Sequence, residues 1–118
     1  LDIKVEKVEP VSNAPVPSDL EDLTSGTIND VITPGGVATL TGTRLKFDQA
    51  DINQGLFFVA SNGAATTRVS KVIDIKSSKV IFMIPAELVN GEYTLEVRIL
   101  PYGNKEIKKG ALEDKLTI

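Results

Sequence analysis

The 118-residue sequence contains no cysteine and no histidine. The absence of cysteine excludes disulfide bonds, iron–sulfur clusters, thiolate zinc sites and a cysteine nucleophile. The absence of histidine removes the usual general base at neutral pH and the usual ligand of transition metals. Any catalysis would have to use carboxylates, lysine, serine, threonine or tyrosine, and packing has to stabilise the fold.

Long hydrophobic runs are also missing. No segment approaches the roughly 20 consecutive apolar residues of a membrane-spanning helix, and no basic-then-apolar signal segment opens the chain. We therefore expect a soluble protein with no membrane contact, and its length suits one domain with one core. Leu1 stands where an initiator methionine would, and the only methionine is Met83. We expect the chain to be part of a longer protein.

The sequence has no surplus of positive charge, since 13 basic residues face 16 acidic ones. Residues 1–25 carry six acidic residues and two lysines, and the remainder is nearly neutral. Proteins that bind duplex DNA usually have a clustered basic surface. The dispersed charges therefore predict no autonomous DNA binding.

Short alternating or β-branched segments, separated by proline and glycine, predict strands rather than helices. The clearest strand is 92–100, where Tyr93, Leu95, Val97 and Ile99 alternate with polar residues. Further strands are predicted at residues 38–43, 56–60, 69–75, 80–84 and 112–118. About seven or eight short strands are typical of an antiparallel β-sandwich, and we predict an all-β, Ig-like fold.

The first 25 residues are expected to lie outside this sandwich. Ile3, Val5 and Val8 are spaced for a short strand, whereas the proline-containing segment 10–17 favours an extended linker. We therefore place an N-terminal strand and acidic linker at residues 1–25. The Ig-like domain is placed at residues 26–118.

The few aromatic residues are expected to anchor a modest core. They are Phe47, Phe57, Phe58, Phe82 and Tyr93. The step Gly91-Glu92-Tyr93 resembles the start of a tyrosine-corner strand, in which the hydroxyl group binds the loop before the strand. We assign structural roles to Gly91, Tyr93 and Phe82.

The segment FDQADINQG offers three oxygen-bearing side chains, Asp48, Asp51 and Asn53, as candidate metal ligands. An EF-hand loop needs alternating acids, a central glycine and a terminal glutamate, and this spacing does not match it. Side chains that cap turns between strands explain the same residues. We expect no bound metal. Calcium binding would instead raise the melting temperature in millimolar calcium.

Catalytic motifs are not found. The serines have no histidine to activate them and do not lie in a G-x-S-x-G elbow. Glu92 and Glu96 project from the solvent face of one predicted strand, roughly 13 Å apart at about 3.3 Å per residue. We expect neither catalytic residues nor a cofactor, and we predict that the protein is not an enzyme.

Four runs resemble an uncharacterised Ig-like domain of Bacteroides-type bacteria: ITPGGVATLTGTRLKFD, GLFFVASNG, KVIFMIPAELVNGEYTLEVRI and ALEDKLTI. In that family the domain follows an N-terminal histone-like, HU-type DNA-binding domain. The first and third runs are more loosely similar to transcription-factor immunoglobulin (IPT/TIG) domains. The resemblance covers about residues 26–118 and implies a cytoplasmic, nucleoid-associated parent protein with this chain as its C-terminal module.

Two functional hypotheses follow. The resemblance implies a non-enzymatic accessory module that contacts a protein partner or a second copy, with DNA bound only by another domain. Arg98, Lys105, Lys108 and Lys109 are the candidate interaction surface. The alternative is an extracellular Ig-like spacer or glycan-binding domain at the cell surface. Glycan-binding faces usually expose aromatic residues, and Tyr102 is the one predicted in a loop. No small-molecule ligand is assigned.

Overall fold

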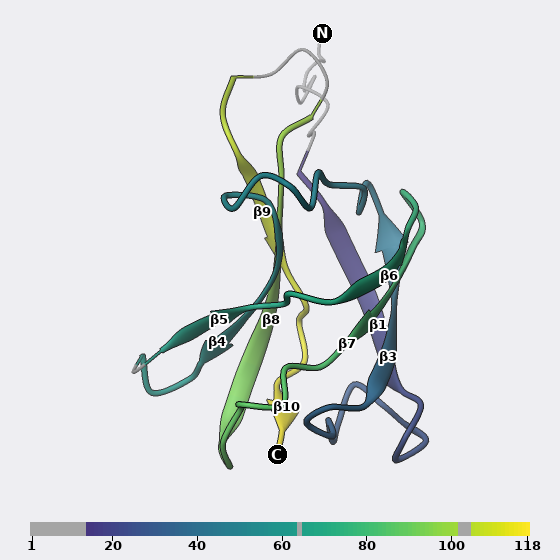
Figure 1. Ribbon diagram of the computed structural model, residues 1–118, viewed down its shortest axis with the longest axis vertical. Coiled ribbons are helices and arrows are strands. Elements are labelled where there is room, and N and C mark those ends of the chain that lie inside the picture. Colours follow the sequence, from purple (N-terminus) through teal and green to yellow (C-terminus); the bar gives the residue numbers. More distant parts are fainter. Residues whose placement is uncertain (1–13, 64, 102–104) are drawn as a thin grey trace, which may run out of the picture.

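The chain forms a β-sandwich of two antiparallel sheets in a computed structural model that describes residues 14–63, 65–101 and 105–118 (Figure 1). The first sheet contains, in spatial order, β2 (Thr27–Ile28), β1 (Val16–Asp22), β3 (Val37–Thr43), β7 (Lys79–Met83) and β6 (Val72–Ile75). The second contains β10 (Leu116–Thr117), β8 (Glu92–Ile99), β4 (Gly55–Ala60) and β5 (Thr66–Arg68), and β9 (Lys108–Ala111) also pairs with β8. The predicted all-β antiparallel sandwich is confirmed. The described residues include no helix long and apolar enough to cross a membrane.

The described residues form ten strands, of which β1, β2, β5 and β9 lie outside the predicted strands, and two predicted strands are shorter than expected. The predicted strand 69–75 begins only at Val72, because Val69 lies at the crossover between β5 in one sheet and β6 in the other. The predicted strand 112–118 is reduced to β10, and β9 forms just before it as an additional strand. Both β9 and β10 lie along β8, where Ala111 pairs with Glu96 and Leu116 pairs with Tyr93.

The core lies between the two sheets and is centred on three aromatic rings. The Phe58 ring lies 6.2 Å from the Phe82 ring and 6.4 Å from the Tyr93 ring, with which it makes an edge-on contact. Phe58 and Phe82 are completely buried. Edge-on and tilted ring pairs add to the stabilisation that burial alone gives. The predicted core roles of these residues agree with their burial.

β1 corrects the prediction that residues 10–25 form a linker. This strand pairs with β3 from Val16 to Asp22, and Leu20 is 1% exposed in the core. Asp22 hides the strand pattern because it occupies a buried position where an apolar residue would be expected. Its carboxylate accepts hydrogen bonds from the Thr33 hydroxyl (2.8 Å) and the Thr24 N–H (3.3 Å), which offsets the cost of burying the charge. The sandwich therefore begins before residue 26. The strand predicted from Ile3, Val5 and Val8 lies outside the described residues.

β10 connects the two halves of the sandwich near the C-terminal end (Figure 1). One of its edges pairs with β8, and the other meets the segment before β3. The Thr117 N–H donates to the Asp30 carbonyl, and the Thr117 carbonyl accepts from the Ile32 N–H, both at 2.9 Å. The Val31–Thr117 bridge is parallel. These contacts join residues that are far apart in the sequence.

Candidate functional site

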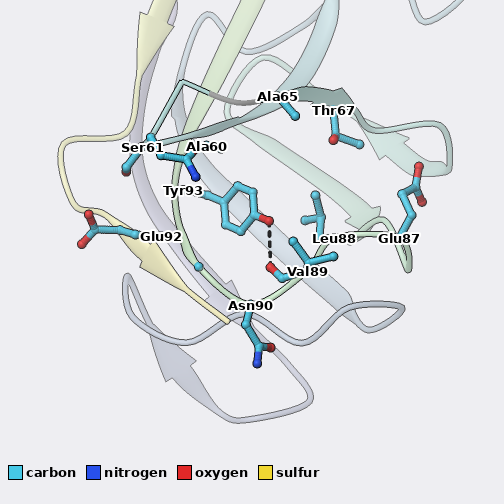
Figure 2. A pocket seen from close by; sticks show the side chains of 12 residues that line it. Ala60, Ser61, Ala65, Thr67, Glu87, Leu88, Val89, Asn90, Glu92 and Tyr93 are labelled. Atoms are coloured by element: carbon cyan, nitrogen blue, oxygen red, sulfur yellow. Dashed lines mark hydrogen bonds between the residues drawn. The ribbon is translucent and has the colours of Figure 1, made fainter.

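A groove of about 420 Å³ lies between the β4–β5 hairpin and the loop before β8 (Figure 2). Its apolar lining comes from Ala60, Ala65, Leu88, Val89 and Tyr93. The charged lining residues are Glu87 and Glu92, both exposed. Concave, mostly apolar surfaces with a few polar groups are the usual form of binding sites. The groove is therefore the candidate functional site.

Tyr93 fixes one wall of the groove. Its hydroxyl group donates a hydrogen bond of 2.7 Å to the Val89 carbonyl oxygen, as Figure 2 shows. This is the contact that the tyrosine-corner pattern predicts. The Val89 side chain is 71% exposed, so the bond holds the loop backbone while leaving an apolar side chain in solvent.

Gly91 continues this wall toward β10. Its φ angle of 153° lies in a region that favours glycine. Its N–H donates to the Ile118 carbonyl (3.3 Å), and its carbonyl accepts from the Ile118 N–H (2.9 Å). Gly91, Tyr93 and Phe82 thus occupy structural positions, the first two at the groove and Phe82 in the core.

The candidate metal ligands lie elsewhere, in the loop between β3 and β4. The Asp48 carboxylate accepts the Ala50 N–H (3.0 Å), and the Asp51 carboxylate accepts the Asn53 N–H (2.9 Å). Both contacts are turn caps. Among the residues that the structure describes, no group of three or more His, Cys, Asp or Glu side chains could hold a metal ion.

Hydrogen bonds hold Asp51 in its charged form. The Asn53 N–H contributes most to lowering the pKa of Asp51 below its usual 3.8, followed by the side chain of Gln54 and the charge of Arg68. The Gln54 amide donates to the second carboxylate oxygen at 3.1 Å. Each oxygen of the Asp51 carboxylate thus accepts one hydrogen bond from within the loop.

Arg68 organises this loop, and sequence reasoning did not identify that role. Its guanidinium donates to the carbonyl oxygens of Gln49 (2.8 Å), Asp51 (3.0 Å) and Gln54 (2.9 Å). Gly55 makes room for the guanidinium, because a Cβ at this position would lie 3.3 Å from Arg68 Nε. Three backbone acceptors around one planar cation make a rigid loop. No spacing in the sequence points to contacts of this kind.

Gln54 ties the same loop to the end of β8. It is 6% exposed, and its Oε1 atom accepts the N–H groups of Asp48 (3.1 Å) and Leu100 (3.0 Å). Buried amides are retained where they satisfy backbone groups that have no strand partner. Gln54 therefore acts as a structural connector between two loops.

The four predicted interaction residues differ in their exposure and in their contacts within the domain. The Arg98 guanidinium lies 4.0 Å from the Phe57 ring centre and 2.6 Å from the Glu96 carboxylate, and its side chain is 26% exposed. Lys109 pairs opposite Arg98 and is exposed, Lys105 is exposed, and Lys108 is half-buried. Arg98 thus covers an outward-facing aromatic ring. An interaction through the lysines stays a prediction, and Tyr102 lies outside the described residues.

The strand order and core define an Ig-like β-sandwich. The chain belongs to a family described as a domain of unknown function (DUF4469) with an Ig-like fold, whose model matches residues 18–111. This match confirms the predicted Ig-like fold and includes most of β1. No curated protein matches the chain.

Among solved structures, the chain is similar to a crystal structure from Bacteroides vulgatus ATCC 8482 that is described as a "putative bacterial DNA binding protein". The two chains are 22% identical with a TM-score of 0.73, and the match covers 83% of this chain and 45% of that one. The likeness shows a shared fold, and the present chain spans less than half the length of that protein. The links to an HU-type domain and to IPT/TIG domains stay predictions.

Proposed function

We propose that this Ig-like domain is a non-enzymatic interaction module of a larger bacterial DNA-binding protein, in which a separate HU-type domain contacts DNA. The observation that carries the proposal is the fold-level likeness to less than half of a protein described as DNA-binding. The remainder of such a protein has room for another domain. Under this proposal the protein is cytoplasmic and nucleoid-associated.

The surface chemistry supports contact with protein rather than with DNA. The groove beside Tyr93 is apolar, and its charged residues are acidic. Arg68 and Arg98, two cations that could otherwise meet phosphate, bind backbone carbonyls and a carboxylate within the domain. DNA binding depends on clustered cations that replace counterions. Apolar grooves of this kind instead bind protein side chains.

Cross-linking of the full-length protein in cells tests the proposal. A specific protein partner attached to this domain is the expected result. Val89→Asp, which places a charge at the groove, should weaken the cross-link. Ile73→Asp on β6 is the matched control, because Ile73 is similarly exposed (60% against 71%) but lies outside the groove. Recovery of no partner beyond the protein itself would contradict the proposal.

A DNA-binding measurement on the 118-residue chain provides the second test. We expect no saturable change in fluorescence anisotropy with a labelled duplex at about 50 mM salt, where electrostatic binding is strong. Tight, salt-dependent binding by the chain alone would mean that this domain itself binds DNA, and would contradict the proposal. The full-length protein serves as the positive control.

The alternative function, glycan binding at a cell surface, has less support. The aromatic side chains in the described residues are all buried, the most exposed being Phe47 and Phe57 at 6%. Glycan sites usually stack sugars on exposed aromatic rings. Specific binding on a glycan array would favour this alternative over the DNA-linked function.

A further inference from the structure

β5 is an edge strand with outward-facing hydrogen-bonding groups. It pairs with β4 alone among the described strands. The Val69 N–H donates to the Leu56 carbonyl (2.8 Å), and the Ala65 carbonyl accepts the Ala60 N–H (3.0 Å). Because antiparallel pairing alternates, the N–H and C=O groups of Thr66 and Arg68 point away from β4. An added strand would find two donors and two acceptors there.

The apolar groove lies directly beside this edge. Figure 2 shows Ala65 and Thr67 along one side of the groove and Leu88 and Val89 along the other. Side chains of a strand alternate between its two faces. Every second side chain of a strand added to β5 would therefore lie on the Thr67 face, over the groove. Backbone pairing and a side-chain pocket are thus found together.

The edges formed by β6, β2 and β10 are less suited to strand addition. β6 carries a register shift between Val72 and Asp74, and irregularities of this kind twist an edge away from further pairing. β2 has two residues, Thr27 and Ile28. The second edge of β10 already meets residues 30–32. Of these four edges, that of β5 combines regular pairing with an adjacent apolar groove.

The charge of the groove indicates the chemistry of its ligand. Glu87 and Glu92 are its charged lining residues, and both are acidic. Complementary charges favour encounter and fix the register of a bound segment. A complementary segment therefore carries an apolar residue for the groove and lysine or arginine beside it.

We propose that β5 and the adjacent groove bind an extended segment of a partner protein by strand addition. An apolar side chain of the segment fills the groove beside Tyr93, and basic residues at its flanks face Glu87 and Glu92. Strand addition is a recurrent mode of peptide recognition, in which the backbone provides affinity and the pockets provide specificity. This inference rests on the proposed function and names the surface and the class of ligand.

Thr66→Pro is the variant that isolates strand addition. Proline removes the outward N–H of Thr66 and leaves the hydrogen bonds to β4 in place, as edge strands tolerate. Thr66→Ala is the matched control, because it shortens the same side chain and keeps the N–H. A urea melt of each variant establishes that the fold is retained.

The probe is a fluorescently labelled peptide of alternating valine and threonine with lysine at both ends. We expect it to bind the wild type and Thr66→Ala, and to bind Thr66→Pro about tenfold more weakly. A peptide with glutamate in place of lysine should bind the wild type more weakly. Hydrogen exchange provides the structural readout, since the amides of Thr66 and Arg68 should become protected when the lysine peptide is added.

Equal binding to Thr66→Pro and the wild type, or no binding at millimolar peptide, would overturn the inference. The cross-linking experiment decides the proposed function separately, because a partner held equally by Thr66→Pro would leave that function standing. Sedimentation without peptide distinguishes the occupants. A dimer that Thr66→Pro dissociates would identify a second copy of the chain and overturn the assignment to a different protein.

Discussion

Gly110 of β9 lies against the backbone of Pro15, so closely that a Cβ atom at position 110 would overlap the Pro15 carbonyl oxygen. Pro15 directly precedes β1 in the first sheet, whereas β9 belongs to the second. The start of β1 therefore packs across the edge of the other sheet. A residue with a side chain at position 110 would separate the two.

Gly110→Ala is expected to destabilise the domain, because either Pro15 or β9 has to move. Overpacking of this kind costs about 1 to 3 kcal/mol. The midpoint of urea denaturation measures the change. Lys109→Ala is the control, since Lys109 is exposed on the same strand, and should stay within about 0.5 kcal/mol of the wild type. An unchanged midpoint for Gly110→Ala would contradict the close packing.

Tyr93→Phe removes the hydrogen bond to the Val89 carbonyl and keeps the buried ring. We expect a loss of about 1 kcal/mol in the free energy of unfolding. The loop at the groove should also open more readily, which hydrogen exchange at Gly91 would detect. Equal stability and equal exchange would mean that the hydroxyl contributes nothing to the loop.

Phe82→Ala leaves a cavity at the centre of the core, where Phe82 packs against Phe58. The expected loss is about 3 to 5 kcal/mol. Ile73→Ala on the neighbouring strand is the control, because Ile73 is exposed and its truncation should change little. Denaturation in urea compares the two variants, and similar losses for both would rule out the central role of Phe82.

Arg68→Lys tests the loop between β3 and β4. Lysine keeps the charge but cannot donate from a planar group to the carbonyls of Gln49, Asp51 and Gln54. We expect a loss of about 1 to 3 kcal/mol, because at least one partly buried carbonyl is left unpaired. Arg44→Lys, at an exposed position, should be nearly neutral. A neutral Arg68→Lys would mean that the guanidinium contacts do not stabilise this loop.

The lowered pKa of Asp51 predicts that the stability of the domain depends on pH. Its hydrogen bonds lower its pKa in the folded state below 3.8, so the unfolded chain binds the proton first as the pH falls. The contribution of Asp51 is therefore complete above about pH 3.8 and is lost as the pH falls through the folded pKa. Urea melts of the wild type and Asp51→Asn should differ most at neutral pH and converge in acid. A constant difference across this range would contradict the assignment.

Strands with one buried and one solvent-exposed face were predictable from the alternation of apolar and polar residues, as β8 shows. Tyr93, Leu95, Val97 and Ile99 are buried in alternation along it. β1 was missed because the buried Asp22 breaks the apolar alternation, and its hydrogen-bond partner Thr33 cannot be inferred from local pattern. The additional strand β9, and the shortening of the last predicted strand to β10, were missed for a related reason. The hydrophobic periodicity of a segment indicates which side chains share a face of a strand. It does not reveal at which residue the pairing with a neighbouring strand ends.

The candidate site was less predictable than the fold. Turn capping by Asp48 and Asp51 follows from neighbouring residues and was expected. The roles of Arg68 and Gln54 depend on contacts across two loops, as in the Gln54–Leu100 hydrogen bond. The groove forms where the β4–β5 hairpin meets the loop before β8. Only the tertiary arrangement brings these segments together.

The position of β10 has a consequence for the order of folding. The backbone groups of Asp30 and Ile32 obtain their partners from Thr117, near the opposite end of the sequence. Contacts this distant in sequence form late, because a long loop must close before they stabilise anything. During translation the first sheet can assemble from β1, β3 and β7, but its link to β10 has to wait for residue 117. Until β10 has formed, the backbone groups of Asp30 and Ile32 therefore lack these partners, and the two sheets are not joined at this edge.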